Sequence, residues 1–377
     1  MQHGTQVASS VEHHRPRNDE RLQETSTFRR LLRRPELGAV AGLVFVVAFF
    51  LATASPSMFS LAGIINILEP AAQLGIVAIG ASLLMIGGEF DLSVGSMIAF
   101  SGLVFGSLLV ALQIALPIAI LATLAMAAGV GVVNSTITIR TGLPSFIVTL
   151  AFMFILRGLS LVGIKTVTGG ASQLRGFKEA VGEGWVAELF SGDALTGLFS
   201  WMASNGWIGT FGAGTPVVKG IPVVVIWFFL IAIASAFVLV RTRFGNWIFA
   251  VGGDMSAARN SGVPVVKVKT ALFILAACCA ALVGILTVLD AGSTDARRGF
   301  QKEFEAIIAA VIGGCLLTGG YGSTIGAFFG AIIFGMVLIG LTYTGIDQDW
   351  YLVFLGGMLL IAVIFNSFIR KRVTGER

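Results

Sequence analysis

Two carboxylates stand in the middle of a long apolar part of this chain. Glu89 and Asp91 lie in the segment IGGEFDLSVGS (86–96), with AAQLGIVAIGASLLM before it and MIAFSGLVFGSLLVAL near its end. Glycines lower helix stability by about 1 kcal/mol each relative to alanine, and three of them surround the carboxylates: Gly87, Gly88 and Gly95. Acidic side chains of this kind do chemistry as hydrogen-bond acceptors, proton carriers or ion partners, so their position needs an explanation.

Two interpretations of this segment stay open. In the first it is a turn between two helices, with Glu89 simply solvated. In the second it is a broken helix at membrane depth, where free backbone groups are tolerated only inside protein or beside a water-filled cavity. An ionised Asp in lipid costs at least about 2.5 kcal/mol, so Asp91 would face such a cavity, and Asp91 and Ser93 would cap the next helix. We favour a structural cap beside a solute pathway over direct solute binding.

Other polar residues interrupt apolar segments further along. Arg157, in FILRGLS, is expected near the outer end of its span, where it could snorkel, or paired with an acid such as Glu303. Asn134, Ser145 and Thr149 are polar groups on otherwise apolar segments. They are expected either to form helix-to-helix hydrogen bonds or to line a path for a polar solute.

Several kinds of chemistry are disfavoured by the sequence. The three histidines all lie in the first 14 residues, and the three cysteines show no spacing typical of a metal site. The glycine-rich run GGCLLTGGYGS is not followed by Gly-Lys-Ser/Thr, so it does not match a phosphate-binding loop. We therefore expect no metal, no catalytic residue and no cofactor in this chain, and any ATP must be bound by another polypeptide.

Composition places the chain in a membrane. Of 377 residues, 56% are hydrophobic and 12% are charged, and the mean hydropathy is +0.91; soluble domains carry about 25% charged residues. Membrane helices need about 20 mostly apolar residues. The sequence predicts an all-α, polytopic integral membrane protein with about ten transmembrane helices, some short or broken, at 37–57, 71–87, 92–112, 115–137, 145–163, 221–241, 268–290, 303–318, 323–343 and 349–367.

Basic residues near the span ends predict the orientation. Arg29, Arg30, Arg33 and Arg34 precede the first span, and Arg370, Lys371 and Arg372 follow the last. Basic flanks lie on the cytoplasmic side, so both termini are expected there. The predicted organisation is a disordered cytoplasmic tail (1–36), a transmembrane domain (37–367) with an enlarged periplasmic loop (164–220) and a long cytoplasmic loop (242–266), and a cytoplasmic C-terminal tail (368–377).

The long cytoplasmic loop (242–266) carries the pattern of a short helix. In GDMSAARNSG, Asp254 suits an N-cap, Ala257 and Ala258 favour helix, and Gly262 suits the position after the helix end. It is either a surface helix without a partner or a docking helix whose small alanines let it enter a groove of another protein.

Four motifs in order resemble the permeases of sugar-importing ABC transporters, the ribose permease-like family of binding-protein-dependent systems. They are GGEFDLSVGS, NSTITIRTGLPSFIVTLAFMFILRGLSLV, FGNWIFAVGGDMSAARNSGVPV and EFEAIIAAVIGGCLLTGGYGSTIGAFFGA, and together they cover about residues 60–367. The third departs from the family at Asp254, usually Asn, and at Val263, usually Ile. The positions that match the family's coupling segment are Gly252, Gly253, Ala257, Ala258, Arg259, Ser261 and Gly262.

The resemblance implies a transporter subunit of the bacterial inner membrane and not an enzyme. In such a system a periplasmic binding protein delivers a simple sugar (pentose, hexose or polyol), two ATPase subunits dock on the 254–262 helix, and a second permease subunit completes a homodimer or heterodimer. The expected partners are thus these proteins and membrane lipid, with no nucleic acid. An ion-coupled secondary transporter of a small polar solute is the main alternative; an intramembrane enzyme is a weaker one.

A possible internal repeat adds to this picture. The segment at 82–106 can be laid over the segment at 315–335 with small gaps, although glycine-rich membrane segments also resemble one another by chance. Transporter folds often contain such repeats, with the solute path between them.

Overall fold

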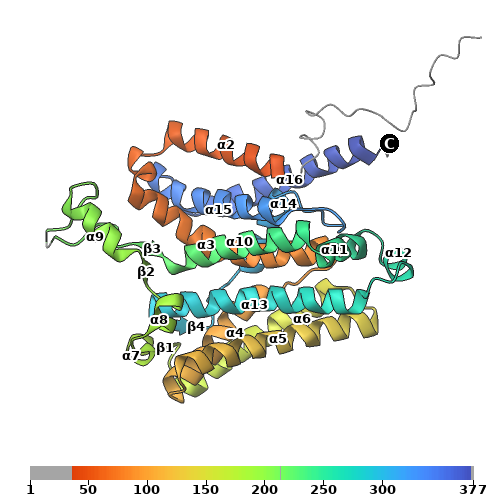
Figure 1. The fold of residues 1–377 in the computed structure, drawn as a ribbon, viewed down its shortest axis with the longest axis horizontal. Coiled ribbons are helices and arrows are strands. Elements are labelled where there is room, and N and C mark those ends of the chain that lie inside the picture. Colours follow the sequence, from red (N-terminus) through yellow and green to blue (C-terminus); the bar gives the residue numbers. More distant parts are fainter. Residues whose placement is uncertain (1–35, 213, 375–377) are drawn as a thin grey trace, which may run out of the picture. The chain divides into compact units, whose positions relative to one another are not determined.

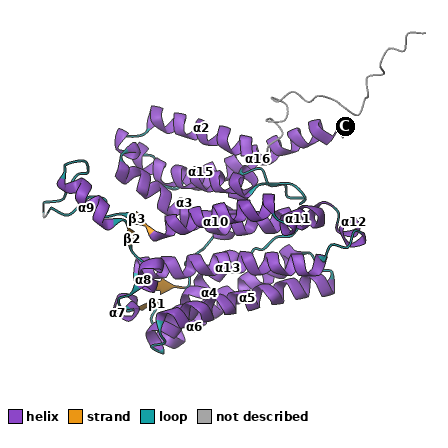
Figure 2. Cartoon of the chain, viewed as in Figure 1, coloured by secondary structure: helices purple, strands orange, loops and turns teal. Residues whose placement is uncertain are grey.

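The computed structural model describes residues 36–212 and 214–374, which belong to one compact unit. Long helices run side by side and short elements gather at one end (Figures 1 and 2). The predicted N-terminal tail lies outside the described residues, except for Glu36. The longer helices are α2 (Glu36–Thr53), α3 (Leu61–Ile86), α4 (Val94–Gly106), α5 (Leu116–Thr141), α6 (Ser145–Thr168), α10 (Val223–Arg241), α13 (Val265–Ala291), α15 (Thr324–Thr344) and α16 (Trp350–Thr374).

The all-α polytopic class is confirmed, with a smaller number of full spans than predicted. Among the described residues, eight helices are long and apolar enough to cross a membrane, from α2 to α15, counting α4 together with its π-helical continuation Ser107–Ala111. The predicted span 303–318 contains only the 11-residue helix α14 (Lys302–Ile312), which stops at a glycine pair. The last predicted span lies in α16, of which Trp350–Ile364 is a shorter apolar stretch; this helix continues to Thr374, into the predicted C-terminal tail.

Two helices form the centre of the bundle. The apolar windows of α3 and α13 are each 78% buried, against 11% for α2 and 28% for α6. Both carry runs of small residues, AAQLGIVAIGAS in α3 and LAACCAALVG in α13. Small side chains let helix backbones approach closely, which drives packing where lipid offers no hydrophobic advantage. Helix α3 therefore contacts α10, α13, α14 and α15 around it.

The long loop predicted at 164–220 is largely structured. Helix α6 extends to Thr168, and short helices follow: α7 (Phe177–Val181), α8 (Trp185–Phe190) and α9 (Thr196–Ser204). Strand β1 (Gln173–Arg175) pairs antiparallel with β4 (Ser293–Asp295), and β2 (Asp193–Ala194) pairs antiparallel with β3 (Ile221–Pro222). These elements lie at one end of the bundle, called the α9 end below (Figure 2).

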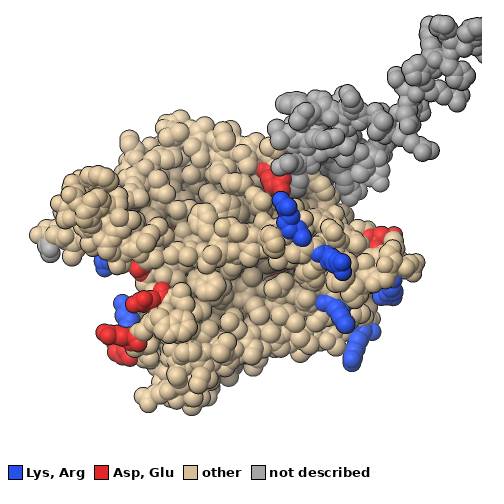
Figure 3. Space-filling model, viewed as in Figure 1, with Lys and Arg blue, Asp and Glu red and all other residues tan. Residues whose placement is uncertain are grey.

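The opposite end carries the segment between α10 and α13. It folds into α11 (Arg243–Gly253) and α12 (Met255–Asn260), and we call this end the α12 end (Figure 1). On the face shown in Figure 3, charged side chains gather at these two ends, and the surface between them is free of charge. An uncharged belt between charged ends is the pattern expected of a membrane-spanning bundle.

Candidate functional site

A short helix, α12, forms at the position predicted for the coupling helix and has the predicted caps. The Asp254 carboxylate accepts hydrogen bonds from the amides of Ser256 and Ala257 at 2.8 and 2.9 Å. At the other end the Gly262 amide donates to the Arg259 carbonyl and the Val263 amide to the Ala258 carbonyl, both at 3.0 Å. This is the Schellman pattern, and Gly262 has the φ of +81° that it needs.

The two alanines of this helix differ in a way that the sequence did not indicate. Ala257 is exposed, whereas Ala258 is only 5% exposed and packs into the protein's own core. A bulky residue at Ala258 would therefore disturb the packing of this helix against the rest of the chain. The side of α12 open to a partner carries Ala257, Arg259 and Ser261, all exposed.

Gly252 packs the coupling segment directly onto backbone. A Cβ added there would lie 1.8 Å from the Ile86 carbonyl oxygen and 2.7 Å from the Gly320 nitrogen. The Gly320 amide itself donates to the Ile86 carbonyl at 2.8 Å. The neighbouring Gly253 has open space where a side chain would begin. The end of α11 thus rests on the end of α3 and on the loop before α15.

Those two contacted segments are helix breaks of the same design. After α3, the Gly88 amide donates to the Met85 carbonyl and Gly88 has φ +82°. After α14, the Gly314 amide donates to the Val311 carbonyl and Gly314 has φ +90°. Each pair of helices, α3 with α4 and α14 with α15, therefore forms a helix–Gly-Gly–helix unit. In this local geometry Gly87 and Gly88 correspond to Gly313 and Gly314, whereas the similarity noted in the sequence sets 82–106 over 315–335; the repeat itself stays a prediction.

The first break is held by hydroxyls of α6. The Phe90 amide donates to Ser145 Oγ and the Leu92 amide to Thr149 Oγ1, both at 3.0 Å. Ser145 and Thr149 are buried, so they satisfy amides that the break leaves free. Of the two interpretations of Ser145 and Thr149, hydrogen bonding between segments of the bundle fits. Their partner is the break after α3 and not a regular helix.

Asp91 is buried and, among the described residues, its side chain bonds only to Ser93, the residue before α4, so it does not cap the first amides of that helix as expected. Asp91 Oδ1 accepts from the Ser93 amide at 2.7 Å and from the Ser93 hydroxyl at 2.5 Å. The Ser93 side chain makes no capping bond to α4, against our expectation, because its oxygen faces the Asn134 amide at 3.3 Å. Asn134 lies seven residues before the end of α5, which places this cluster about 10 Å inside the bundle at 1.5 Å per residue. The break is therefore buried inside protein, as the second interpretation requires, while its depth in a membrane stays a prediction.

Glu89 is not a solvated turn residue. It is 7% exposed and forms an ion pair and hydrogen bond with Lys269 in the first turns of α13. Removing either charge would leave the other buried and unpaired, which is strongly destabilising. The pair fixes the first break against α13 at the α12 end.

Arg157 and Glu303 lie in one cluster. Arg157 Nε donates to Ser96 Oγ at 3.2 Å, and the guanidinium lies 5.2 Å from the centre of the Phe300 ring. Glu303 is 3% exposed and lies against Gly95, where a Cβ would nearly coincide with its carboxylate. Arg157 acts on Glu303 electrostatically, but within the described part of the chain the two form no ion pair within 4 Å. One nitrogen of Arg157 and one oxygen of Glu303 are buried there without a hydrogen-bond partner.

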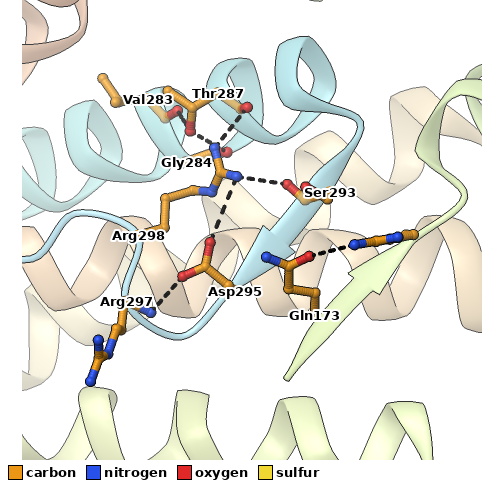
Figure 4. Close-up of polar contacts among 9 residues, drawn as sticks. Gln173, Val283, Gly284, Thr287, Ser293, Asp295, Arg297 and Arg298 are labelled. Atoms are coloured by element: carbon orange, nitrogen blue, oxygen red, sulfur yellow. Dashed lines mark hydrogen bonds and ion pairs between the residues drawn. The ribbon is translucent and has the colours of Figure 1, made fainter. Parts of the chain in front are cut away.

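A second arginine, not singled out in the sequence, organises the α9 end. Arg298 donates to the carbonyls of Thr287 and Ser293 at 2.9 Å each, and its guanidinium lies 3.8 Å from the Asp295 carboxylate (Figure 4). Burial lowers the pKa of Arg298, while the carboxylates of Asp295 and Asp290 oppose that shift. These contacts tie the end of α13 to the chain that leads into α14.

The sequence also missed a polar face on α3. Asn66, Glu69 and Gln73 lie at i, i+3 and i+7, so they share one side of this helix. The predicted span began at 71, directly after Glu69 and Pro70. Helix α3 instead starts at Leu61 and includes Pro70. The spacing of these three polar residues was the signal in the sequence that could have revealed this face of the helix.

The comparisons with known proteins agree with this architecture. Residues 63–363 match the model of the family described as branched-chain amino acid transport system / permease component. The ribose import permease protein of Escherichia coli (strain K12) is 32% identical over 337 residues, covering 89% of this chain and 94% of that protein. The xylose transport system permease protein of the same organism is 31% identical over 364 residues, covering 88% and 92%. No solved structure matches the chain significantly.

Long apolar helices arranged around two glycine-marked breaks define a multi-pass membrane permease. The chain belongs to the branched-chain amino acid transport system / permease component family.

Proposed function

We propose that this chain is the permease subunit of a bacterial ABC importer for a simple sugar. The observation that carries the proposal is the capped helix α12, whose adjoining Gly252 rests on the first helix break and on the loop that follows the second. The similarity to ribose and xylose permeases along almost the whole chain supports the substrate class. The chain acts without an ATPase site of its own, so two separate ATPase subunits supply the energy, a periplasmic binding protein supplies the sugar, and a second permease subunit completes the pathway.

In this proposal a push on α12 reaches the interior through backbone contacts. The ATPase moves α12 and α11, and Gly252 passes the displacement to Ile86 and Gly320, because no side chain lies between them to absorb it. The buried polar residues behind the breaks, Asp91 and Glu303 among them, would then be exposed to the solute path in turn. Polar groups kept inside a membrane bundle are by default functional.

The docking role is tested with two neighbouring alanines. Ala257→Glu should insert normally and remain monodisperse in detergent, yet lose co-purification with the ATPase, because overpacking a tight contact costs about 1–3 kcal/mol and an unpaired charge adds more. Ala258→Glu should instead reduce the yield of folded protein, because that side chain is buried. Normal assembly and uptake by Ala257→Glu would show that α12 is not the coupling helix.

We also propose that both termini lie in the cytoplasm at the α12 end of the inner membrane. The Ser323 hydroxyl donates to Glu36 at 2.8 Å, which supports placing the start of α2 beside this end. Ser256 in α12 and Ser172, directly before β1, are both exposed, and α12 and β1 lie at opposite ends of the bundle (Figure 1). In a background without native cysteines, an impermeant thiol reagent applied to spheroplasts should label Ser172→Cys and spare Ser256→Cys. Equal labelling would overturn the orientation.

A further inference from the structure

Two adjoining cavities surround the outer half of α3, apart from the breaks and the coupling segment. The larger one, ≈ 440 Å³, lies between α3 and α15 and is lined by Asn66, Glu69, Pro70, Gln73, Ile339, Thr342 and Tyr343. The smaller one, ≈ 20 Å³, is lined by Glu69 and Gln73 again and by residues of α8, α10 and α13, including Phe190, Thr287 and Asp290. The first is within the size range of small-molecule pockets, and the second has room for about one water. Glu69 and Gln73 thus stand between a wide space and a constriction.

The polar side chains of the larger cavity are otherwise unused. Among the described residues, no hydrogen bond or ion pair within the protein is found for the side chains of Asn66, Glu69 or Gln73. Asn66 is exposed, and Glu69 and Gln73 are half-buried, on a helix whose apolar window is otherwise 78% buried. The three side chains are therefore accessible from the cavity, and they offer a carboxylate and two amides to a ligand or to water.

The charges around the cavity restrict what it could hold. Glu69 repels the nearby carboxylates of Asp290 and Asp193, and neither cavity is lined by Lys or Arg among the described residues. A phosphorylated sugar or a free amino acid carries an anionic group that would meet no cation here. Hydroxyl groups, in contrast, donate to a carboxylate and both donate to and accept from amides. Tyr343 adds an aromatic wall, which can pack against the apolar face of a sugar ring.

We propose that the larger cavity is a binding site for a neutral polyhydroxylated solute, with Glu69 and Gln73 as its principal hydrogen-bonding groups. The site rests on the proposed function as a sugar permease. It adds that the permease itself selects solutes by their charge. Unphosphorylated sugars enter from the α9 end and are held outside the constriction. Anionic and zwitterionic solutes are rejected, including the amino acids after which the family is described.

The test uses solute protection of a single cysteine, which requires neither the ATPase nor the binding protein. Thr342→Cys lines the cavity and is exposed; it is placed in the full chain without native cysteines and labelled with an impermeant methanethiosulfonate. D-ribose or D-xylose at millimolar concentration should slow labelling. D-ribose 5-phosphate and L-leucine at the same concentrations should not. Protection by these two as strong as by the sugars, or no protection by either sugar, would overturn the site.

Variants in the same background assign the effect to the named groups. Glu69→Gln should raise the half-protecting sugar concentration about tenfold, since a hydrogen bond to a charged group is lost, and Asn66→Ala should raise it less. Asp193→Asn removes a neighbouring carboxylate that does not line the cavity and should change it little. Unchanged protection in Glu69→Gln contradicts the proposal, as does protection by Na⁺ or Mg²⁺ alone, which would indicate a cation site. Uptake by the complete importer is measured separately, so that normal ATP-driven uptake with no sugar protection would reject the cavity and leave the permease role standing.

Discussion

The two ends of the bundle are built on opposite principles. At the α12 end, backbone touches backbone: Gly252 lies against Ile86 and Gly320, and an ion pair between Glu89 and Lys269 fixes the break. At the α9 end, polar side chains of α3 face a cavity of ≈ 440 Å³. The α12 end is therefore close-packed (the filled end), and the α9 end contains a cavity lined by polar side chains (the hollow end).

This difference suggests a division of labour. Close-packed segments have few alternative arrangements and transmit displacement, which suits the end where an ATPase would act. A hollow end with free hydrogen-bonding groups suits the side where a solute arrives. The α12 end should therefore be sensitive to added volume and lost charge pairs, and the α9 end to lost polarity in function but not in folding.

The largest effect is expected from breaking the ion pair at the α12 end. Lys269→Met leaves the Glu89 carboxylate buried without its partner, and we expect a loss of stability of about 3 kcal/mol. Thermal unfolding in detergent measures it. Glu89→Gln combined with Lys269→Met should recover most of the loss, because no unpaired charge remains. If the single and double variants unfold at the same temperature, the pair does not hold this end together.

Substituting two adjacent glycines at the filled end should change protein stability in opposite directions. Gly252→Ala forces a Cβ against backbone and should destabilise the protein by about 2 kcal/mol and impair uptake. Gly253→Ala meets nothing within 4 Å and should be neutral or stabilising by up to about 1 kcal/mol, since alanine favours helix. The hollow end supplies the contrast: Asn66→Leu should change stability by less than about 0.5 kcal/mol, as expected of an exposed site. Equal shifts in unfolding temperature for the two glycine variants would contradict the close packing proposed at Gly252.

Local signals in the sequence predicted the helix at the α12 end well. A capping aspartate, two alanines and a terminal glycine are short-range features, and the helix from Met255 to Asn260 has the predicted start and stop. The glycine pair at 87–88 likewise indicated a break, because glycine adopts the positive φ that the end of α3 requires.

Long-range packing explains the errors. Nothing near Glu89 indicated that Lys269, 180 positions away, would neutralise it, and helix periodicity alone did not reveal which of two alanines faces the core. The predicted span starting at 71 left out the first part of α3, which includes Pro70; membrane helices accommodate proline. The run GGCLLTGG contains two glycine pairs, and only the fold shows that the first pair follows the end of a helix.

The central claim is that this chain transports by means of a separate ATPase acting at α12. Its most direct test is uptake of radiolabelled D-ribose or D-xylose into proteoliposomes that contain the permease, the partner ATPase and the binding protein. We expect uptake only when ATP is present on the ATPase side, abolished by disabling the ATPase and by Ala257→Glu in this chain. Uptake by the permease alone that follows a proton or sodium gradient, with no need for ATP, would contradict the account.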